Sequence, residues 1–516
     1  MSFSADKVTK DLARGAGIIF IGTFLMYIFK FIYRIIVSRY LGPEGYGLLS
    51  LGDVVMNFGY MIALIGLDVG LMRHLAYFKE KGDIARLKGS FWGTILISGT
   101  LSAILILLLI TFSRHLSLYV FKNPELAPIL IVFAIAIPLC IFARIIGQTL
   151  LAFKKQWYEF FSKVLGRDFI NLILVSIIIL IGGSVLQIAI MYLIALTISI
   201  ITGYIFLERK VFPFAREKTK SIFEHKERIS FAFPLFFSAV FINVMQWIDT
   251  FFIGYFRSTA EVGIYNVALP LATSLGIFLT AFAPIFYPII ASMIAKGQEK
   301  NVHQVYATMI RWTYLFSAPL LLLIILFPKL IINIFFGEQY LAASTVLVIL
   351  SLSYFINITV GLTFETLVSF GKTKLIFWLN SLAVIVNILL AVLLTPRFGI
   401  IGAATGTAIT IALREIISFI IVKRLINLRL CSLIKNYLKI TLSLAVSLIL
   451  TAIIYLLLRE VLSLYFLMSV AILTLFGSYF LLLFISRAIN YDDYLILDAI
   501  GQRIGFKVDR FQRFFK

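Results

Sequence analysis

The stretch QTLLAFKK at residues 148–155 returns in altered form as ETLVSFGK at residues 365–372. Each stretch ends a long apolar segment, and Thr, Leu, Phe and Lys keep their places at an offset of 217 residues. Two further pairs of segments lie 216 residues apart, namely YGLLS at 46–50 with VGIYN at 262–266, and 171–183 with 387–399. A nearly shared offset predicts a tandem duplication, and chance similarity among leucine-rich helix ends is the alternative.

The composition indicates a membrane protein. The chain is 61% hydrophobic and only 14% charged over 516 residues, whereas a soluble chain of this length needs more charged surface. A helix that crosses the hydrocarbon core needs about 20 apolar residues. The predicted spans lie near 15–38, 46–72, 90–112, 126–152, 167–183, 186–207, 230–254, 264–294, 310–333, 341–369, 376–395, 400–422, 440–458 and 464–486. We therefore expect an all-α polytopic membrane protein with 14 transmembrane helices.

The net charge of +21 is unevenly distributed between the predicted loops. With a cytoplasmic N-terminus, only seven of the 46 Lys and Arg residues fall in outer loops. They are Arg39, Arg114, Lys122, Arg257, Lys329, Arg397 and Arg459. This bias follows the positive-inside rule, so we expect both termini and the loop 208–229 to be cytoplasmic in the plasma membrane. The basic loops also attract anionic lipid headgroups, and their distribution argues against a nucleic-acid partner.

The repeat predicts the domain organisation. A repeated unit with six spans gives two copies of the same orientation, related by an axis along the membrane normal. We expect two parallel six-helix lobes plus two C-terminal helices. The predicted boundaries are an N-lobe at 1–207, a cytoplasmic basic linker at 208–229, a C-lobe at 230–435, spans 13 and 14 within 436–486, and a cytoplasmic amphipathic tail at 487–516.

The predicted tail interleaves aromatic and basic residues. They are Phe506, Phe511, Phe514 and Phe515 among Lys507, Arg510, Arg513 and Lys516. This pattern suits an interfacial helix on an anionic leaflet, and a solvated tail is the alternative.

Charged residues inside the predicted spans mark a candidate site, because such residues cost about 2.5–3.5 kcal/mol at the helix centre and usually face protein or water. The basic ones are Lys30, Arg34, Arg144 and Arg414, and the acidic ones are Asp53, Asp249, Glu365 and Glu415. Asp68 and Asp168 stand at the inner boundaries, close to Arg73 and Arg167. We expect these two acids at the surface or at helix caps.

Two hypotheses fit the charges within the spans. In the structural one, Lys30 or Arg34 pairs with Asp53, and Arg144 or Arg414 pairs with a glutamate. In the functional one, the basic residues line a hydrated cavity between the lobes and bind an anion, while the acids couple to an ion or form pairs. The depth of Lys30 and Arg144 favours the second hypothesis, because neither reaches the membrane surface with ease.

The sequence has few features of metal binding, nucleotide hydrolysis or catalysis. Cys140, Cys431 and the four histidines are scattered without the spacing of metal ligands. No phosphate-binding loop of the nucleotide-hydrolysing type is present in the sequence. We expect neither a metal site nor catalytic residues, and hence no enzyme.

The segment SRYLGPEGYGLLSL at 38–51, after a first span that begins near DLARGAG, resembles the opening of Wzx-type polysaccharide flippases. These belong to a superfamily with the MATE multidrug exporters and the lipid II flippase MurJ. The resemblance implies two six-helix lobes that alternate access, and a lipid-linked oligosaccharide as substrate. It leaves the coupling ion, sodium or proton, undetermined. Glycan-assembly enzymes would be the associated partners.

Two other functions are considered. A MATE-like exporter of drugs or small molecules has the same fold, but acidic cavity residues suit its cationic substrates better. A membrane-embedded sugar polymerase needs carboxylates in a sizeable outer loop. The longest outer loop, 113–125, contains one acid, Glu125. The flippase is therefore the preferred hypothesis, because a cationic cavity would offset the lost hydration of a lipid-linked phosphate.

The charge distribution generates a topological prediction. In a variant without Cys140 and Cys431, a cysteine at position 257 should react in sealed cells with an impermeant maleimide, and one at position 220 should not. Labelling at 220 without labelling at 257 would reverse the predicted topology.

Overall fold

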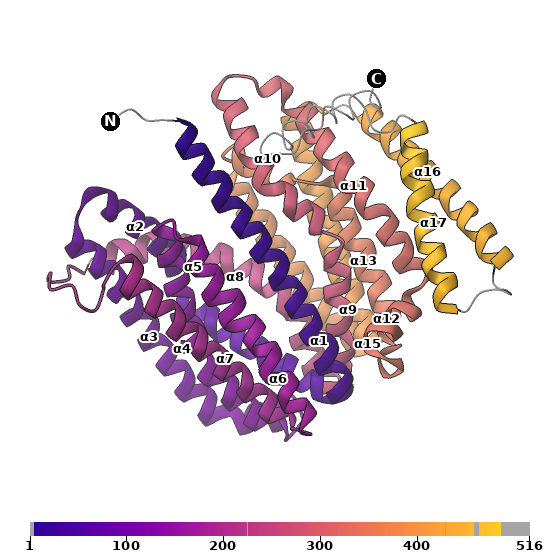
Figure 1. Ribbon diagram of the computed structural model, residues 1–516. Coiled ribbons are helices and arrows are strands. Elements are labelled where there is room, and N and C mark those ends of the chain that lie inside the picture. Colours follow the sequence, from indigo (N-terminus) through magenta and orange to yellow (C-terminus); the bar gives the residue numbers. More distant parts are fainter. Residues whose placement is uncertain (1–4, 224, 429, 459–463, 487–516) are drawn as a thin grey trace. The chain divides into compact units, whose positions relative to one another are not determined.

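The computed structural model describes residues 5–223, 225–428, 430–458 and 464–486, which form helices and no strands (Figure 1). Within these residues, eight helical segments are long and apolar enough to cross a membrane. They are Gly22–Leu64, Ile84–Val120, Leu126–Ala152, Val185–Val211, Val302–Leu326, Ala343–Ser369, Thr373–Leu425 and Leu433–Leu458. The all-α class and the multi-pass membrane character are confirmed, and the count of 14 spans stays a prediction.

The first part of the chain contains seven α-helices and three short π-helical segments. They are α1 (Ala5–Leu64), α2 (Leu67–Lys81), α3 (Ile84–His115), η1 (Leu116–Val120), α4 (Leu126–Ala152), α5 (Gln156–Phe160), η2 (Phe161–Phe169), α6 (Ile170–Leu180), α7 (Val185–Phe206) and η3 (Leu207–Val211). α1 combines the first predicted span with most of the second, and it breaks at Gly42, whose φ of 70° favours glycine.

The later helices follow a similar order. They are α8 (His225–Phe256), α9 (Thr259–Ser274), α10 (Ile277–Ala295), η4 (Glu299–Asn301), α11 (Val302–Leu326), α12 (Pro328–Phe336), η5 (Glu338–Tyr340), α13 (Ala343–Val360), α14 (Thr363–Ser369), α15 (Thr373–Leu425), α16 (Leu430–Leu458) and α17 (Leu464–Ile485). α15 contains two predicted spans and breaks at Gly399, where φ is 58°.

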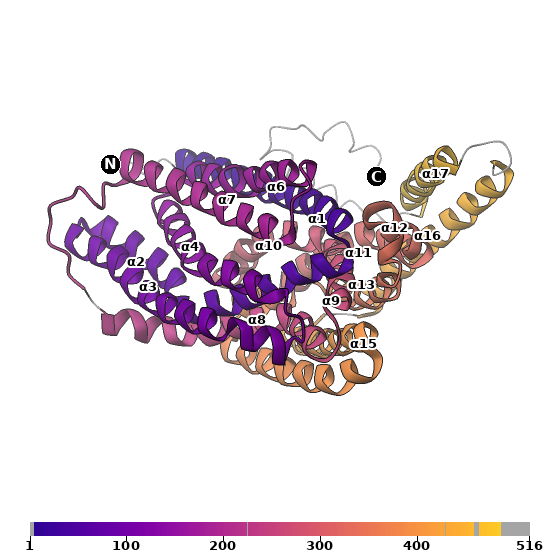
Figure 2. The ribbon, with the colours of Figure 1, turned by 90° about the horizontal axis from the view of Figure 1, so that it is seen from below.

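The chain divides into two compact units, and the larger one comprises 1–270, 329–349 and 380–410. Within this unit, α2 packs beside α3 and α6 beside α7, and α4 contacts α3, α7 and α1 (Figure 2). Side chains of α4 such as Leu130, Ile137 and Ile145 are fully buried. The central place of α4 follows from its composition, because it is apolar over most of its length and has protein neighbours on several sides.

The smaller unit comprises 271–328, 350–379 and 411–516. Phe286, Tyr306 and Leu362 belong to a buried cluster contributed by α10, α11 and the segment before α14. In the same unit α16 and α17 lie side by side (Figure 1). The Tyr479 hydroxyl of α17 donates to the Leu315 carbonyl of α11 at 2.8 Å, which ties the last helix pair to this unit. The predicted amphipathic tail 487–516 lies outside the described residues.

The basic segment after η3 is packed against α3. The Lys88 ammonium donates to the carbonyl oxygens of Glu217 and Thr219. The Phe214 ring is buried and stacks on Phe91 with 4.2 Å between the ring centroids. The Ile222 amide also donates to the Ala85 carbonyl at 3.1 Å. Up to Ile222, this part of the predicted linker therefore belongs to the larger unit as a fixed segment.

α1 and α9 approach each other at two glycines. A Cβ added at Gly47 would lie 1.7 Å from the Thr259 carbonyl oxygen, and one added at Gly263 would lie 2.0 Å from the Pro43 carbonyl oxygen. Gly47 thus faces Thr259, which lies four residues before Gly263, and Gly263 faces Pro43, which lies four residues before Gly47. Only glycine allows backbones to come this close, as in other membrane helix contacts.

This contact generates a stability prediction. Gly47→Ala and Gly263→Ala should each destabilise the protein by about 1–3 kcal/mol, because the added methyl group meets a backbone carbonyl that cannot rotate away. The measurement is the apparent Tm of the purified protein in detergent. Gly99→Ala in α3 is the matched control, since its Cβ would meet nothing within 4 Å. Equal melting temperatures for all four proteins would contradict the close contact.

Candidate functional site

A polar cavity of about 430 Å³ lies inside the larger unit. Its walls come from α1, α4, α5, η2, α6, α7, α8 and α9. The uncharged polar side chains that line it include Tyr33, Asn57, Tyr60, Gln148, Asn171 and Tyr192. A cavity with so many polar groups within membrane-spanning helices is suited to water or to a polar ligand.

Charged side chains dominate the chemistry of this cavity. Its basic lining residues are Lys30, Arg34, Arg144, Lys163 and Arg167, and its acidic lining residues are Asp53, Glu159 and Asp168. The formal charge of the lining is therefore positive, with five cations against three anions. Three of the four predicted cations, together with Asp53, lie in this one cavity.

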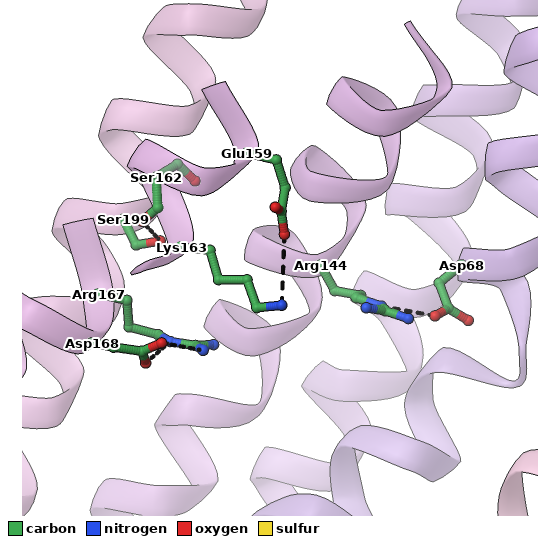
Figure 3. A network of polar contacts seen from close by, with 8 residues as sticks. All are labelled: Asp68, Arg144, Glu159, Ser162, Lys163, Arg167, Asp168 and Ser199. Carbon is green, nitrogen blue, oxygen red and sulfur yellow. Dashed lines mark hydrogen bonds and ion pairs between the residues drawn. The ribbon is translucent and has the colours of Figure 1, made fainter. Parts of the chain in front are cut away.

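Three of the five cations form ion pairs (Figure 3). The Arg144 Nε lies 2.9 Å from Asp68 Oδ2, and the Lys163 Nζ lies 3.6 Å from Glu159 Oε1. The Arg167 Nε lies 2.9 Å from Asp168 Oδ1, and a second guanidinium nitrogen bonds the other carboxylate oxygen at 3.4 Å. The last pair is mostly buried, whereas the side chain of Lys163 is 41% exposed.

Lys30 and Arg34 lie on the cavity wall near Asp53, which comes from the other side of the break in α1. Across the described ranges, neither cation approaches Asp53 closely enough for an ion pair. The structural hypothesis of a Lys30–Asp53 or Arg34–Asp53 pair is therefore not realised in this conformation. Both cations remain available to an anion that enters the cavity.

The π-helix η2 presents two cations that the sequence analysis did not select, Lys163 and Arg167. A π-helix is wider than an α-helix and often occurs at functional sites. The Ser199 hydroxyl of α7 donates to the Ser162 carbonyl at 2.7 Å, and Gly166 lies against Ser199 and allows the two helices to approach (Figure 3). Lys163, outside the predicted spans, and Arg167, at the start of the predicted span 167–183, thereby lie in the cavity wall.

Asp68 and Asp168 were expected at the surface or at helix caps, and neither lies at the surface. Asp68 does stand in the first turn of α2, but it is only 7% exposed and pairs with Arg144. Asp168 is 8% exposed and pairs with Arg167. Both acids neutralise cavity cations, because a buried carboxylate needs a partner. The hypothesis that Arg144 or Arg414 pairs with a glutamate is met by Arg414, which pairs with Glu415, whereas Arg144 pairs with Asp68.

The remaining predicted residues of the twelfth and tenth spans belong to the smaller unit. Arg414 pairs with Glu415, with 3.1 Å between Nε and Oε1, and the Thr363 hydroxyl donates to Glu415 at 3.1 Å. Glu365 is half-buried on α14, two residues after Thr363. None of the three charged residues is among those that line the cavity of the larger unit.

Asp249 forms a separate buried cluster in the larger unit. Its Oδ2 accepts hydrogen bonds from the hydroxyls of Tyr265, at 2.7 Å, and Thr407. The Asn387 amide donates to the Thr407 hydroxyl at 3.0 Å. Within the described part of the chain, Asp249 Oδ1 and Asn387 Oδ1 are buried without a hydrogen-bond partner. Buried polar atoms ordinarily have such a partner, so these two acceptors are exceptional.

The helices and the cavity define a multi-pass helical membrane protein with an internal cationic chamber. A sequence model of the family described as "Polysaccharide biosynthesis protein" matches residues 12–294, more than half of the chain. The chain therefore belongs to that family. A second model, MatE, matches residues 234–393.

Similar proteins agree with this assignment. An uncharacterized membrane protein of Methanocaldococcus jannaschii is 26% identical over 373 residues, which cover 68% of this chain and 73% of that protein. The protein named "Probable low-salt glycan biosynthesis flippase Agl15" of Haloferax volcanii is 27% identical over 175 residues, 33% of this chain and 36% of that one. The match therefore spans about a third of that flippase.

The fold is that of a known transporter structure. The lipid II flippase MurJ in an inward closed conformation superposes with a TM-score of 0.69 and 18% sequence identity. The superposition covers 90% of this chain and 97% of the MurJ chain. This likeness shows the fold, while the family and the relatives named as flippases indicate a transporter.

Proposed function

We propose that this protein is a flippase that moves a lipid-linked oligosaccharide from the cytoplasmic to the outer leaflet by alternating access. The observation that carries the proposal is the cavity of the larger unit, in which five cations face three acids. A polyprenyl phosphate or diphosphate must lose hydration when it leaves the membrane surface, and fixed cations offset that loss. The polyprenyl tail stays in the bilayer, where it needs no protein cavity.

Lys30 and Arg34 are the first phosphate ligands in this proposal. They lie one helical turn apart on α1, so their side chains reach the same anion. Arg144 is a third ligand, which retains Asp68 as its counter-ion. Arg414, in the smaller unit, is proposed to meet the substrate at another stage of the cycle.

The proposed architecture has two parallel lobes, 1–207 and 230–435, which are joined by 208–229 and followed by spans 13 and 14 within 436–486. The reciprocal contact of α1 and α9 supports it. Gly47 and Gly263 are 216 residues apart, as are Pro43 and Thr259. Equivalent points of two copies therefore touch each other, which is the pattern that a twofold axis produces. We place both termini in the cytoplasm and the protein in the plasma membrane, in accord with the charge distribution.

The cluster around Asp249 is the proposed coupling site. An ionised carboxylate buried without a cation is costly, and Asp249 Oδ1 and Asn387 Oδ1 are oxygen acceptors without a hydrogen-bond partner in the described ranges. A sodium ion or a proton would satisfy them. Asp53, Glu365 and Glu415 are proposed to pair with cations during the cycle. Glycan-assembly enzymes are the proposed partners on the cytoplasmic side.

A MATE-like exporter is the second candidate, because the MatE model matches 234–393. Such a protein would bind cationic molecules. The positive lining of the cavity opposes that substrate class, because like charges in a cavity of low dielectric constant repel strongly. A sugar polymerase finds no support in the family or in the relatives.

The proposal generates a mutational prediction. Lys30→Gln should lower transport of the lipid-linked glycan by about tenfold or more, because one phosphate contact is lost. Lys30→Arg should keep partial activity, since the charge survives but the shape does not. The measurement is the amount of surface glycan in cells that depend on this protein.

Asp53→Asn provides the discriminating control for that experiment. If Lys30 serves only to balance Asp53, the double variant Lys30→Gln/Asp53→Asn should regain transport. If Lys30 binds phosphate, the double variant should reach the membrane in normal amounts and still fail. Normal glycan transport by a well-expressed Lys30→Gln/Arg144→Gln protein would overturn the proposed site.

A further inference from the structure

The cavity contains a second group of charges that the proposed phosphate ligands do not use. Lys163 and Glu159 lie one turn apart at the junction of α5 and η2, and both line the cavity. Their ion pair is loose, with 3.6 Å between Nζ and Oε1. The side chains are 41% and 19% exposed, so the ammonium is more open to the cavity than the carboxylate.

The neighbouring pair has a different character. The Arg167 guanidinium and the Asp168 carboxylate share two hydrogen bonds and are 19% and 6% exposed. Charge-assisted bonds of this bidentate kind are strong, and they hold Arg167 in place. The looser pair therefore exchanges partners more readily than the tighter one.

Glu159 is close to more than one cation. Its carboxylate faces Lys163, and the Arg144 side chain lies beside this pair (Figure 3). The stem of Glu159 lies against Gly147 of α4, where a Cβ would be 3.7 Å from the Glu159 Cγ.

We propose that Glu159 is an exchangeable counter-ion, which holds Lys163 when the cavity is empty and yields it to an incoming phosphate. Lys163 is then a further phosphate ligand. This inference rests on the proposed function, because it concerns the same cavity and the same anion. Since Glu159 competes for the cation, it also weakens the bound state and assists release of the phosphate. A transporter needs binding that is favourable enough to load and weak enough to unload.

The test measures the binding of inorganic diphosphate to the full-length protein in lipid nanodiscs by isothermal titration calorimetry, without divalent cations. Glu159→Gln should bind diphosphate about tenfold more tightly than the wild type, because the internal competitor is gone. Lys163→Gln should bind it more weakly than the wild type. The double variant Glu159→Gln/Lys163→Gln should lose the gain of the first substitution.

Asp53→Asn is the matched control, since it removes the same formal charge from the same cavity, and Asp53 has no ion pair in the described part of the chain. It should tighten binding much less than Glu159→Gln. An equal gain for both variants would show a general effect of cavity charge and would overturn the counter-ion role. An unchanged affinity in Glu159→Gln would overturn it as well.

Transport separates this inference from the proposed function. If the wild type moves lipid-linked glycan but Glu159→Gln binds diphosphate no more tightly, the counter-ion role fails and the flippase stands. If Glu159→Gln binds diphosphate more tightly but the wild type moves no lipid-linked glycan, the flippase fails and the counter-ion role stands.

Discussion

The cost of charge in hydrocarbon governs this protein. A basic side chain inside a membrane-spanning helix persists only where it meets water, a carboxylate or a ligand. The larger unit gathers five basic side chains around one cavity, three of them on candidate membrane spans, and supplies carboxylates to three of the five. The two on α1, Lys30 and Arg34, are left to water or to an anion. This imbalance is the basis for proposing a binding chamber instead of a set of structural ion pairs.

Backbone features bring these charges together. The break at Gly42 turns α1 so that Asp53 returns to the wall that holds Lys30 and Arg34. The π-helix η2 carries Lys163 and Arg167 into the same wall, where Ser199 of α7 fixes its backbone. The glycine contact between α1 and α9 then sets how closely these two helices approach. The break in α1 and the contact with α9 use glycine, and η2 is a widened helix. Ordinary helices pack too far apart to bring these groups together.

The sequence predicted the parts of this arrangement that depend on hydrophobicity and depth. The predicted span 126–152 coincides with α4, and Lys30, Arg34 and Arg144 line the cavity as their depth suggested. Lys163 and Arg167 were missed, because loop boundaries drawn from hydropathy assume an α-helix or a loop and do not register a π-helix. Asp68 was assigned to the surface or a helix cap because its partner Arg144 is 76 residues away, and no local pattern reports such a contact. Arg414 belongs to the smaller unit because of packing contacts that the spacing of residues along the sequence does not reveal.

The central claim is that this protein carries a lipid-linked oligosaccharide across the bilayer. The most direct measurement uses the purified protein in sealed liposomes with a fluorescent polyprenyl-diphosphate oligosaccharide in both leaflets. An impermeant reductant is added outside, and a sodium or proton gradient is imposed. The account predicts that the inner-leaflet pool becomes accessible and loses its fluorescence with the wild type. With the Lys30→Gln/Arg144→Gln variant, that pool should stay inaccessible and keep its fluorescence. Protection of the inner pool by the wild type to the same extent as in protein-free liposomes, under either gradient, would contradict the account.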